Sequence, residues 1–141
     1  MTNYNNQFSK AILSLPRYSK RIIAMFSDLA LCILCTWLAF FLRLDELILF
    51  KDFNFYPAIL SVVIALPIFW LFGLYRTIFR YTSLSIILTI SASISIYGLL
   101  YFLVISVYGI EGVPRSIGVL QPMLLLFAII CLRLVVKYLL L

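Results

Sequence analysis

The 141-residue chain is 65% hydrophobic and 16% aromatic, and it combines only 11% charged residues with a formal net charge of +6. Its mean hydropathy of +1.17 lies far above that of an average soluble domain, so the composition excludes a separate soluble catalytic domain and predicts one membrane domain. The basic residues stand at the ends of apolar stretches rather than on a soluble surface. We therefore expect no nucleic-acid partner.

Four apolar stretches account for most of the chain after residue 21. Each is long enough to cross a hydrocarbon core of about 30 Å as a helix, the form that satisfies its own backbone hydrogen bonds in lipid. The sequence predicts an all-α fold, an integral membrane four-helix bundle. The expected domains are a basic cytoplasmic tail over residues 1–21 and a membrane domain over residues 22–141, with spans at about 22–42, 55–74, 84–108 and 117–139.

Charged residues in the tail and the connections orient these spans. Eight basic residues fall on one side of the predicted membrane: Lys10, Arg17, Lys20, Arg21, Arg76, Arg80, Arg133 and Lys137. The opposite side carries three basic residues, Arg43, Lys51 and Arg115, mixed with acidic ones. The positive-inside rule therefore places both the N and the C terminus in the cytoplasm.

The first span contains a carboxylate, Asp28, about 9 Å below the cytoplasmic boundary. An isolated charge at this depth costs a few kcal/mol, and Arg133 in the last span lies at a similar depth. We predict a structural intramembrane pair between Asp28 and Arg133, with a proton or substrate relay as the alternative. The chain has no histidine, so we interpret the intramembrane cysteines as packing residues: Cys32, Cys35 and Cys131.

The second span contains Pro67, which can bend a helix from within. Aromatic and basic residues then form a cytoplasmic interface suited to lipid headgroups: Tyr75, Arg76, Arg80 and Tyr81, together with Lys137 after the last span.

The third span places hydroxyl groups every four residues, at Ser85, Thr89, Ser93 and Tyr97, a pattern that indicates close helix packing rather than a polar conduit. Before the fourth span stands an outer-loop motif, Pro114-Arg115-Ser116, in which Ser116 is expected to cap the helix. The glycines never form the spacing of a phosphate-binding loop. We accordingly expect no catalytic, cofactor-binding or metal-binding residues in this chain.

An ordered set of residues across all four spans resembles a known family. The set comprises Lys20-Arg21 with Asp28, Leu38-Ala39-Phe40 with Leu42-Arg43, Tyr75-Arg76 with Arg80-Tyr81-Thr82-Ser83-Leu84, Pro114-Arg115-Ser116, and Leu132-Arg133 with Lys137. It is similar to the amino-terminal membrane domain of the CapD-like polysaccharide-biosynthesis proteins, which are membrane-bound nucleoside-diphosphate-sugar 4,6-dehydratases and epimerases. The resemblance covers the chain from about Tyr18 to its end.

In that family a cytoplasmic Rossmann-type domain follows the four helices, binds NAD and acts on a UDP-linked amino sugar. The sequence given contains no such domain, so the resemblance implies a membrane anchor in the bacterial inner membrane that is catalytically empty by itself and has no cofactor of its own. The implied partners are the lipid bilayer, a downstream catalytic domain, glycosyltransferases or lipid-linked glycans, and a second copy of the chain.

Two other functions remain open at this point. The amino-terminal bundle of the polyprenyl-phosphate sugar-1-phosphate transferases has a similar topology and shares some of the motifs. A small four-helix flippase or transporter acting alone is an alternative from another class, although such proteins usually place a carboxylate or a polar cluster near the midplane, whereas Asp28 is off-centre.

Overall fold

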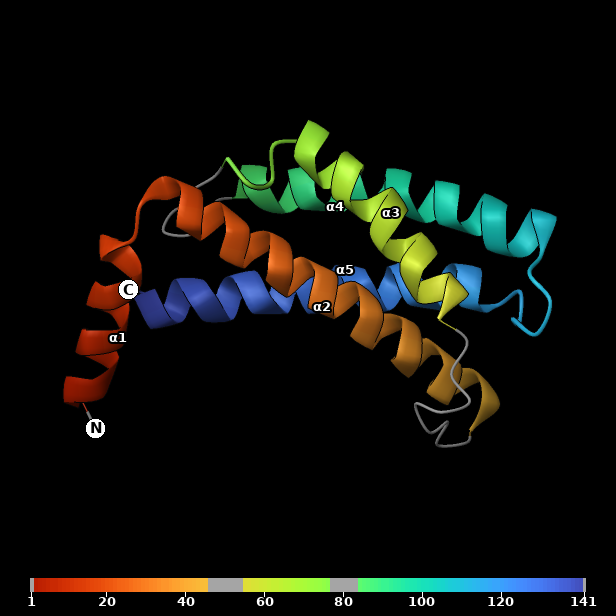
Figure 1. Cartoon of the computed structure of the whole chain (residues 1–141), viewed down its shortest axis with the longest axis horizontal. Helices are drawn as coiled ribbons and strands as arrows, with labels where there is room; N and C mark the ends of the chain where they lie inside the picture. The colour runs from red at the N-terminus through yellow and green to blue at the C-terminus, as the bar shows by residue number, and fades with distance from the viewer. Residues whose placement is uncertain (1, 46–54, 77–83, 141) are drawn as a thin grey trace.

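A computed structural model describes residues 2–45, 55–76 and 84–140, and over these ranges the protein is helical and contains no strands (Figure 1). The helices are α1 (Thr2–Ser14), α2 (Arg17–Leu44), α3 (Tyr56–Leu71), α4 (Leu84–Phe102) and α5 (Ile117–Leu140). A π-helical segment, η1 (Leu103–Tyr108), continues α4 without a break.

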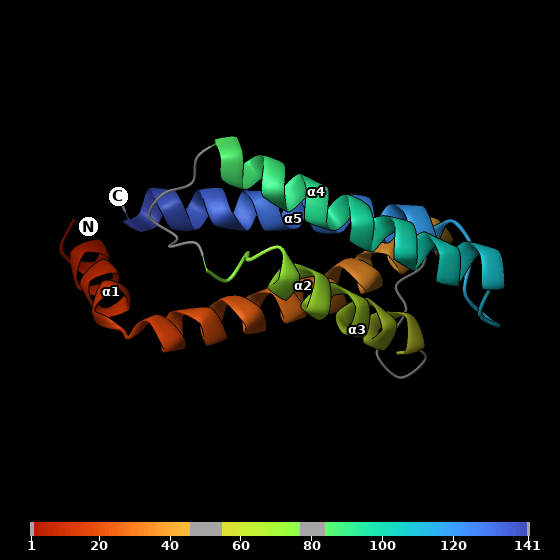
Figure 2. The same cartoon turned by 90° about the horizontal axis from the view of Figure 1, so that it is seen from above.

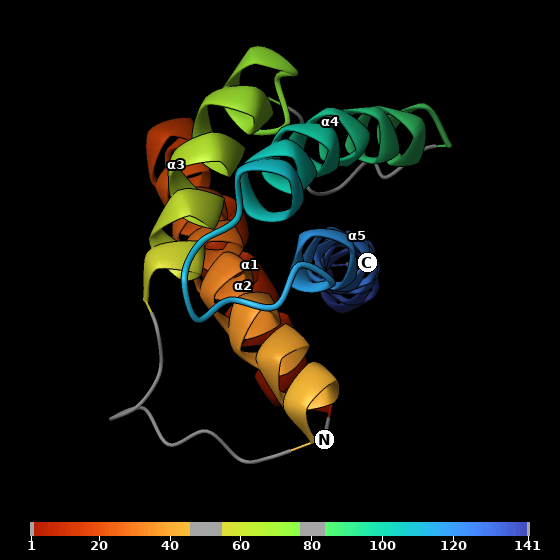
Figure 3. The same ribbon diagram turned by 90° about the vertical axis from the view of Figure 1, so that its right-hand side faces the viewer.

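The four longer helices pack side by side. Helix α5 contacts both α2 and α4, while α3 contacts α2 and α4 on the other side of the assembly (Figures 2 and 3). Helix α1 turns away from the axis of α2 and lies near the carboxyl-terminal end of α5, which it contacts (Figure 1). The two ends of the chain consequently lie on the same side of the assembly.

Three helical stretches are long and apolar enough to cross a membrane: Arg17–Leu44, Leu84–Tyr108 and Ile117–Leu139. They match three of the predicted spans, although the first begins five residues before the predicted boundary. The second predicted span is shorter than expected, because α3 ends at Leu71 and has only 16 residues.

The early end of α3 has a local cause at Gly73. This glycine has a φ of +71°, a left-handed conformation that glycine adopts without steric cost. The Leu74 N–H donates to the Phe69 carbonyl (3.1 Å), and the Gly73 N–H donates to the Trp70 carbonyl (3.1 Å). This is the Schellman arrangement, with Leu74 and Phe69 both buried, and it terminates the helix.

Helix α1 occupies most of the segment that the sequence suggested only as a polar tail. The Lys20 ammonium donates a hydrogen bond to the Leu13 carbonyl (2.9 Å), so a cation stabilises the carboxyl end of α1. Pro16 precedes α2 and has extended backbone angles, which separates the two helices. The turn at Leu15–Pro16 thereby sets α1 at an angle to α2.

Two glycines allow α4, η1 and α5 to approach closely. A Cβ atom on Gly118 would lie 2.5 Å from the Ser106 Oγ and 3.4 Å from the Phe102 Cα. A Cβ atom on Gly98 would lie 3.1 Å from the Pro122 Cβ. Small residues at such contacts are the usual means by which helices pack tightly in lipid, where hydrophobic exclusion from water is not available.

Candidate functional site

The two charged residues predicted to pair lie together in the interior. The Arg133 Nη2 on α5 is 3.7 Å from the Asp28 Oδ2 on α2, and the two residues are 5% and 2% exposed. The Arg133 Nη1 also donates to the Leu74 carbonyl (3.4 Å), in the turn that follows α3. One guanidinium therefore joins α2, α5 and the end of α3.

Tyr75 belongs to the same buried group. The sequence placed it at the headgroup interface, but its side chain is only 6% exposed and its hydroxyl lies beside the Asp28 carboxylate. The Schellman turn explains the difference, because it reverses the chain at Gly73 and turns Leu74 and Tyr75 inward. Neither the Tyr75 Oη nor the Asp28 Oδ2 has a hydrogen-bond partner among the described residues. We call Asp28, Tyr75 and Arg133 the charged cluster.

A second polar group joins three other helix faces. Ser61 on α3, Tyr97 on α4 and Gln121 on α5 are all completely buried. The Ser61 Oγ is 2.7 Å from the Tyr97 Oη, the Tyr97 Oη is 2.6 Å from the Gln121 Oε1, and the Gln121 Nε2 is 2.9 Å from the Ser61 Oγ. These three side chains form a closed hydrogen-bonded ring, which we call the polar ring.

The donors in the polar ring follow from the chemistry of its members. The Gln121 carboxamide oxygen can only accept, so the Tyr97 hydroxyl donates to it, and the Gln121 NH₂ group donates to Ser61. Because the single Tyr97 proton is then used, the Ser61 hydroxyl donates to the Tyr97 oxygen. Each of the three contacts therefore has a donor and an acceptor, and no charge is needed.

Neither Ser61 nor Gln121 was predicted from the sequence, and Tyr97 was predicted only as part of a packing stripe. The available signal was Gln121 itself, a carboxamide within the fourth apolar stretch, where an unsatisfied polar group is costly. Of the stripe on the third span, Ser93 and Tyr97 are buried, Thr89 is partly buried and Ser85 is exposed. Only the second half of α4 therefore packs as predicted.

The remaining residues of the predicted headgroup interface differ in how far their side chains are exposed. Arg76 is exposed, and Lys137 lies in the last turns of α5 and is partly buried. Arg80 and Tyr81 fall outside the described residues. Cys32 and Cys35 are buried in the contact surface of α2, but Cys131 is exposed on α5.

Ser116 does not cap α5 with its side chain, so that expectation was wrong. Its buried Oγ has no hydrogen-bond partner in the described part of the chain. The N–H groups of Gly118 and Val119, which a capping hydroxyl would bind, already donate to the Arg115 and Ser116 carbonyls (both 3.1 Å). In the same motif, the Arg115 carbonyl accepts a 2.8 Å hydrogen bond from the Ser106 hydroxyl of η1.

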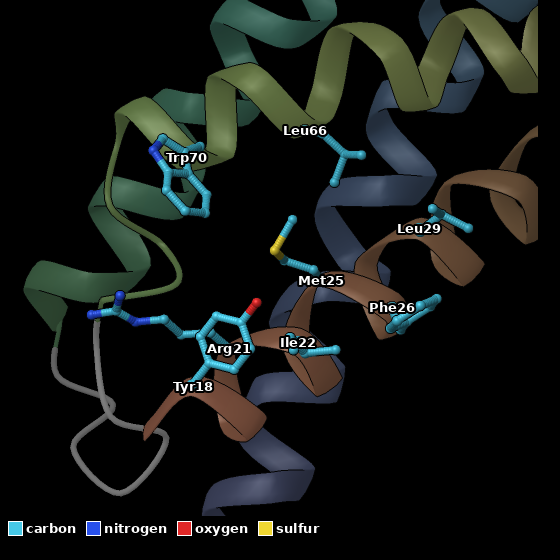
Figure 4. A pocket seen from close by; sticks show the side chains of 8 residues that line it. All are labelled: Tyr18, Arg21, Ile22, Met25, Phe26, Leu29, Leu66 and Trp70. Atoms are coloured by element: carbon cyan, nitrogen blue, oxygen red, sulfur yellow. The ribbon is translucent and has the colours of Figure 1, made fainter. Parts of the chain in front are cut away.

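A groove opens on the outside of the assembly, between the beginning of α2 and the end of α3 (Figure 4). Its volume is about 460 Å³, and its lining consists of Tyr18, Arg21, Ile22, Met25, Phe26, Leu29, Leu66 and Trp70. A smaller hollow of about 60 Å³ adjoins it, lined by Arg21, Trp70, Gly73, Tyr75 and Arg76. Leu66 and Trp70 of α3 face Met25 of α2 across the groove, with Tyr18 and Arg21 near the start of α2.

Comparison with known proteins adds no assignment, because no family model, curated protein or solved structure matches this sequence. The described part of the chain contains a charged cluster, a polar ring and an external groove, carried by helices of which three are suited to cross a membrane.

Proposed function

We propose that this chain is the membrane-anchor domain of a nucleotide-sugar 4,6-dehydratase or epimerase that acts in polysaccharide or glycoconjugate biosynthesis. The proposed form is a four-helix bundle in a bacterial inner membrane, with both termini in the cytoplasm. The enzyme class rests on the ordered residues given above, from Lys20-Arg21 to Lys137. The anchoring role is supported by how the buried polar groups are used.

The observation that carries the anchoring role is that both buried polar groups join helices to one another. Arg133 lies 3.7 Å from Asp28, and the ring of Ser61, Tyr97 and Gln121 closes upon itself. A transporter requires polar groups that face a passage for its substrate. Of the two hollows lined by described residues, the larger lies on the outer surface between α2 and α3, which favours an anchor over a flippase.

In this proposal α3 is the second of four crossings, despite its length. Sixteen residues rise about 24 Å, less than the hydrocarbon thickness of about 30 Å. Tyr56 at its start and Trp70 at its end are largely exposed, as expected of aromatic side chains at the two membrane interfaces. Local thinning of the bilayer accommodates such a mismatch at modest cost.

Reporter fusions test the topology. Fusions after Tyr81 and at the carboxyl terminus should read as cytoplasmic, whereas fusions near Lys51 and Gly112 should read as external. An external carboxyl terminus would contradict both the four crossings and the charge argument.

The functional test uses the whole protein encoded by the reading frame that contains this sequence. Deleting residues 1–141 should move NAD-dependent dehydratase activity on UDP-N-acetylglucosamine from the membrane to the soluble fraction, with the chemistry retained. Replacing residues 1–141 with an unrelated four-span anchor is the matched control and should return the activity to the membrane. Sugar-1-phosphate transferase activity in the full protein, or transport by residues 1–141 alone in proteoliposomes, would replace this proposal with one of the alternatives.

A further inference from the structure

The groove and the smaller hollow are neighbours, because Arg21 and Trp70 line both of them. Taken together, they form an amphipathic surface with these two side chains at the junction. Beyond this junction, the groove is bordered by apolar side chains from α2 and α3, while the hollow contains Arg76 and the turn around Gly73. An occupant that fits both parts has a compact polar end and a long apolar end.

We propose that this site binds one anionic phospholipid, with its phosphate between Arg21 and Arg76 and one acyl chain in the groove. The inference rests on the proposed membrane placement but not on the proposed enzyme class. It assigns to the chain a lipid site in addition to its role as an anchor.

The dimensions of the groove suit an acyl chain of one leaflet. Leu29 lies eight residues after Arg21 on α2, so the lined stretch extends about 12 Å along the helix. One leaflet contributes about 15 Å to the hydrocarbon core. Met25 and Leu66 face one another across this stretch, and their apolar surfaces offer contact to methylene groups (Figure 4).

The hollow suits a phosphate group. Its volume is about 60 Å³, and two of its lining residues are Arg21 and Arg76. Arginine guanidinium groups bind phosphate oxygens through paired, charge-assisted hydrogen bonds. Trp70, which is 57% exposed, and Tyr18 provide the amphipathic rings that sit at headgroup level.

Charge complementarity selects an anionic lipid over a zwitterionic one. Two arginines line the combined site, and none of its described lining residues is acidic. The ammonium group of a zwitterionic headgroup would therefore lie beside Arg21 and Arg76 without a carboxylate to neutralise it. An anionic headgroup meets only the two cations.

Tryptophan quenching by brominated lipids tests the site in the full chain. Trp37→Phe leaves Trp70, which lines both hollows, as the single reporter. The protein is placed in phosphatidylcholine bilayers that contain a small fraction of brominated phosphatidylglycerol or, for comparison, of brominated phosphatidylcholine with the same chains. Brominated phosphatidylglycerol should quench Trp70 at a lower mole fraction than brominated phosphatidylcholine does. The difference should be about fivefold for each arginine that contributes to binding.

Matched variants separate a site from general surface charge. Arg21→Gln together with Arg76→Gln should remove the preference for phosphatidylglycerol, whereas Arg17→Gln, an exposed residue of α2 that lines neither hollow, should retain it. Met25→Trp in a protein without Trp37 and Trp70 puts the reporter inside the groove and should show the same preference.

Two outcomes overturn the proposal, and a third measurement identifies why. Equal quenching of Trp70 by both lipids would show that the groove does not select charge, and quenching by neither would show that a protein helix, such as one from a second copy, fills it. Ile23→Trp, with Trp37→Phe and Trp70→Phe, places a reporter on the exposed face of α2. If neither lipid quenches this reporter, the membrane placement itself is wrong, and the site fails with it.

Discussion

The polar ring and the charged cluster both hold polar side chains inside an apolar protein, but they differ in how completely they are satisfied. In the ring, Ser61, Tyr97 and Gln121 exchange three hydrogen bonds of 2.6 to 2.9 Å without a formal charge. In the cluster, the Asp28 and Arg133 side chains lie 3.7 Å apart. The hydroxyl of Tyr75 and one oxygen of Asp28 make no hydrogen bond with the described residues.

This difference indicates that the two groups contribute to the fold in different ways. A neutral ring costs little to bury, because its members replace the hydrogen bonds that they lose. A buried ion pair adds little net stability, yet removing one partner is expensive, because the other charge remains without compensation. The ring therefore adds stability in small increments, while the charged cluster mainly penalises any arrangement in which α2 and α5 separate.

The largest expected effect comes from breaking the charged cluster on one side. Arg133→Leu leaves the Asp28 carboxylate buried without its cation and should lower the free energy of unfolding by about 3 to 5 kcal/mol. Unfolding in detergent micelles, followed by circular dichroism, measures this change. The double variant Asp28→Asn, Arg133→Leu should recover part of the loss. Losses that simply add would show that the two residues are not coupled.

A smaller effect is expected at the centre of the polar ring. Gln121→Leu removes the acceptor of Tyr97 and the donor to Ser61, leaving two buried hydroxyl groups with one remaining contact. The free energy of unfolding should fall by about 1 to 3 kcal/mol. Met123→Leu, at an exposed position on the same helix, is the control and should change little. An equally stable Gln121→Leu protein would mean that the ring contributes nothing.

The same chemical change at two tyrosines sharpens the comparison. Tyr97→Phe deletes a hydroxyl that takes part in two contacts of the ring, and it should cost about 0.6 to 1.7 kcal/mol of unfolding free energy. The value should be measured under the same micellar conditions as the Gln121 variant. A loss of unfolding free energy below about 0.3 kcal/mol would show that the ring is not maintained in solution.

The smallest effect is expected for Tyr75→Phe. The Tyr75 hydroxyl is buried and makes no hydrogen bond with the part of the chain that the structure describes, so removing it should change the free energy of unfolding by less than about 0.5 kcal/mol, or raise it. This variant is the matched partner of Tyr97→Phe. A loss larger than that of Tyr97→Phe would indicate that the hydroxyl is bonded, for example to a water molecule beside Asp28.

The sequence predicted the parts of the molecule that follow from the cost of placing groups in lipid. Apolar stretches of sufficient length gave three of the membrane-suited helices, and the expense of a lone charge pointed to Asp28 with Arg133. The ring was not predicted, because a carboxamide or a serine in lipid has many candidate partners. Which of them meet depends on the rotation of α3, α4 and α5 about their axes.

Local backbone geometry was also beyond the sequence argument. The apolar run continues through Leu74, so hydropathy alone extended the second span past the point where Gly73 ends the helix. The same turn buries Tyr75, a side chain whose type is typical of a membrane interface. A glycine within an apolar run is the signal that would have placed the end of this helix earlier.

Both polar groups depend on α5, which provides Gln121 and Arg133, so neither group is complete until α5 has been synthesised. At a synthesis rate of about 5 to 20 residues per second, Arg133 is added roughly 5 to 20 s after Asp28. Until then α2, α3 and α4 carry a carboxylate, a serine and a tyrosine that lack their final partners. Chains that stop before α5 therefore keep Asp28, Ser61 and Tyr97 without the partners that Gln121 and Arg133 supply.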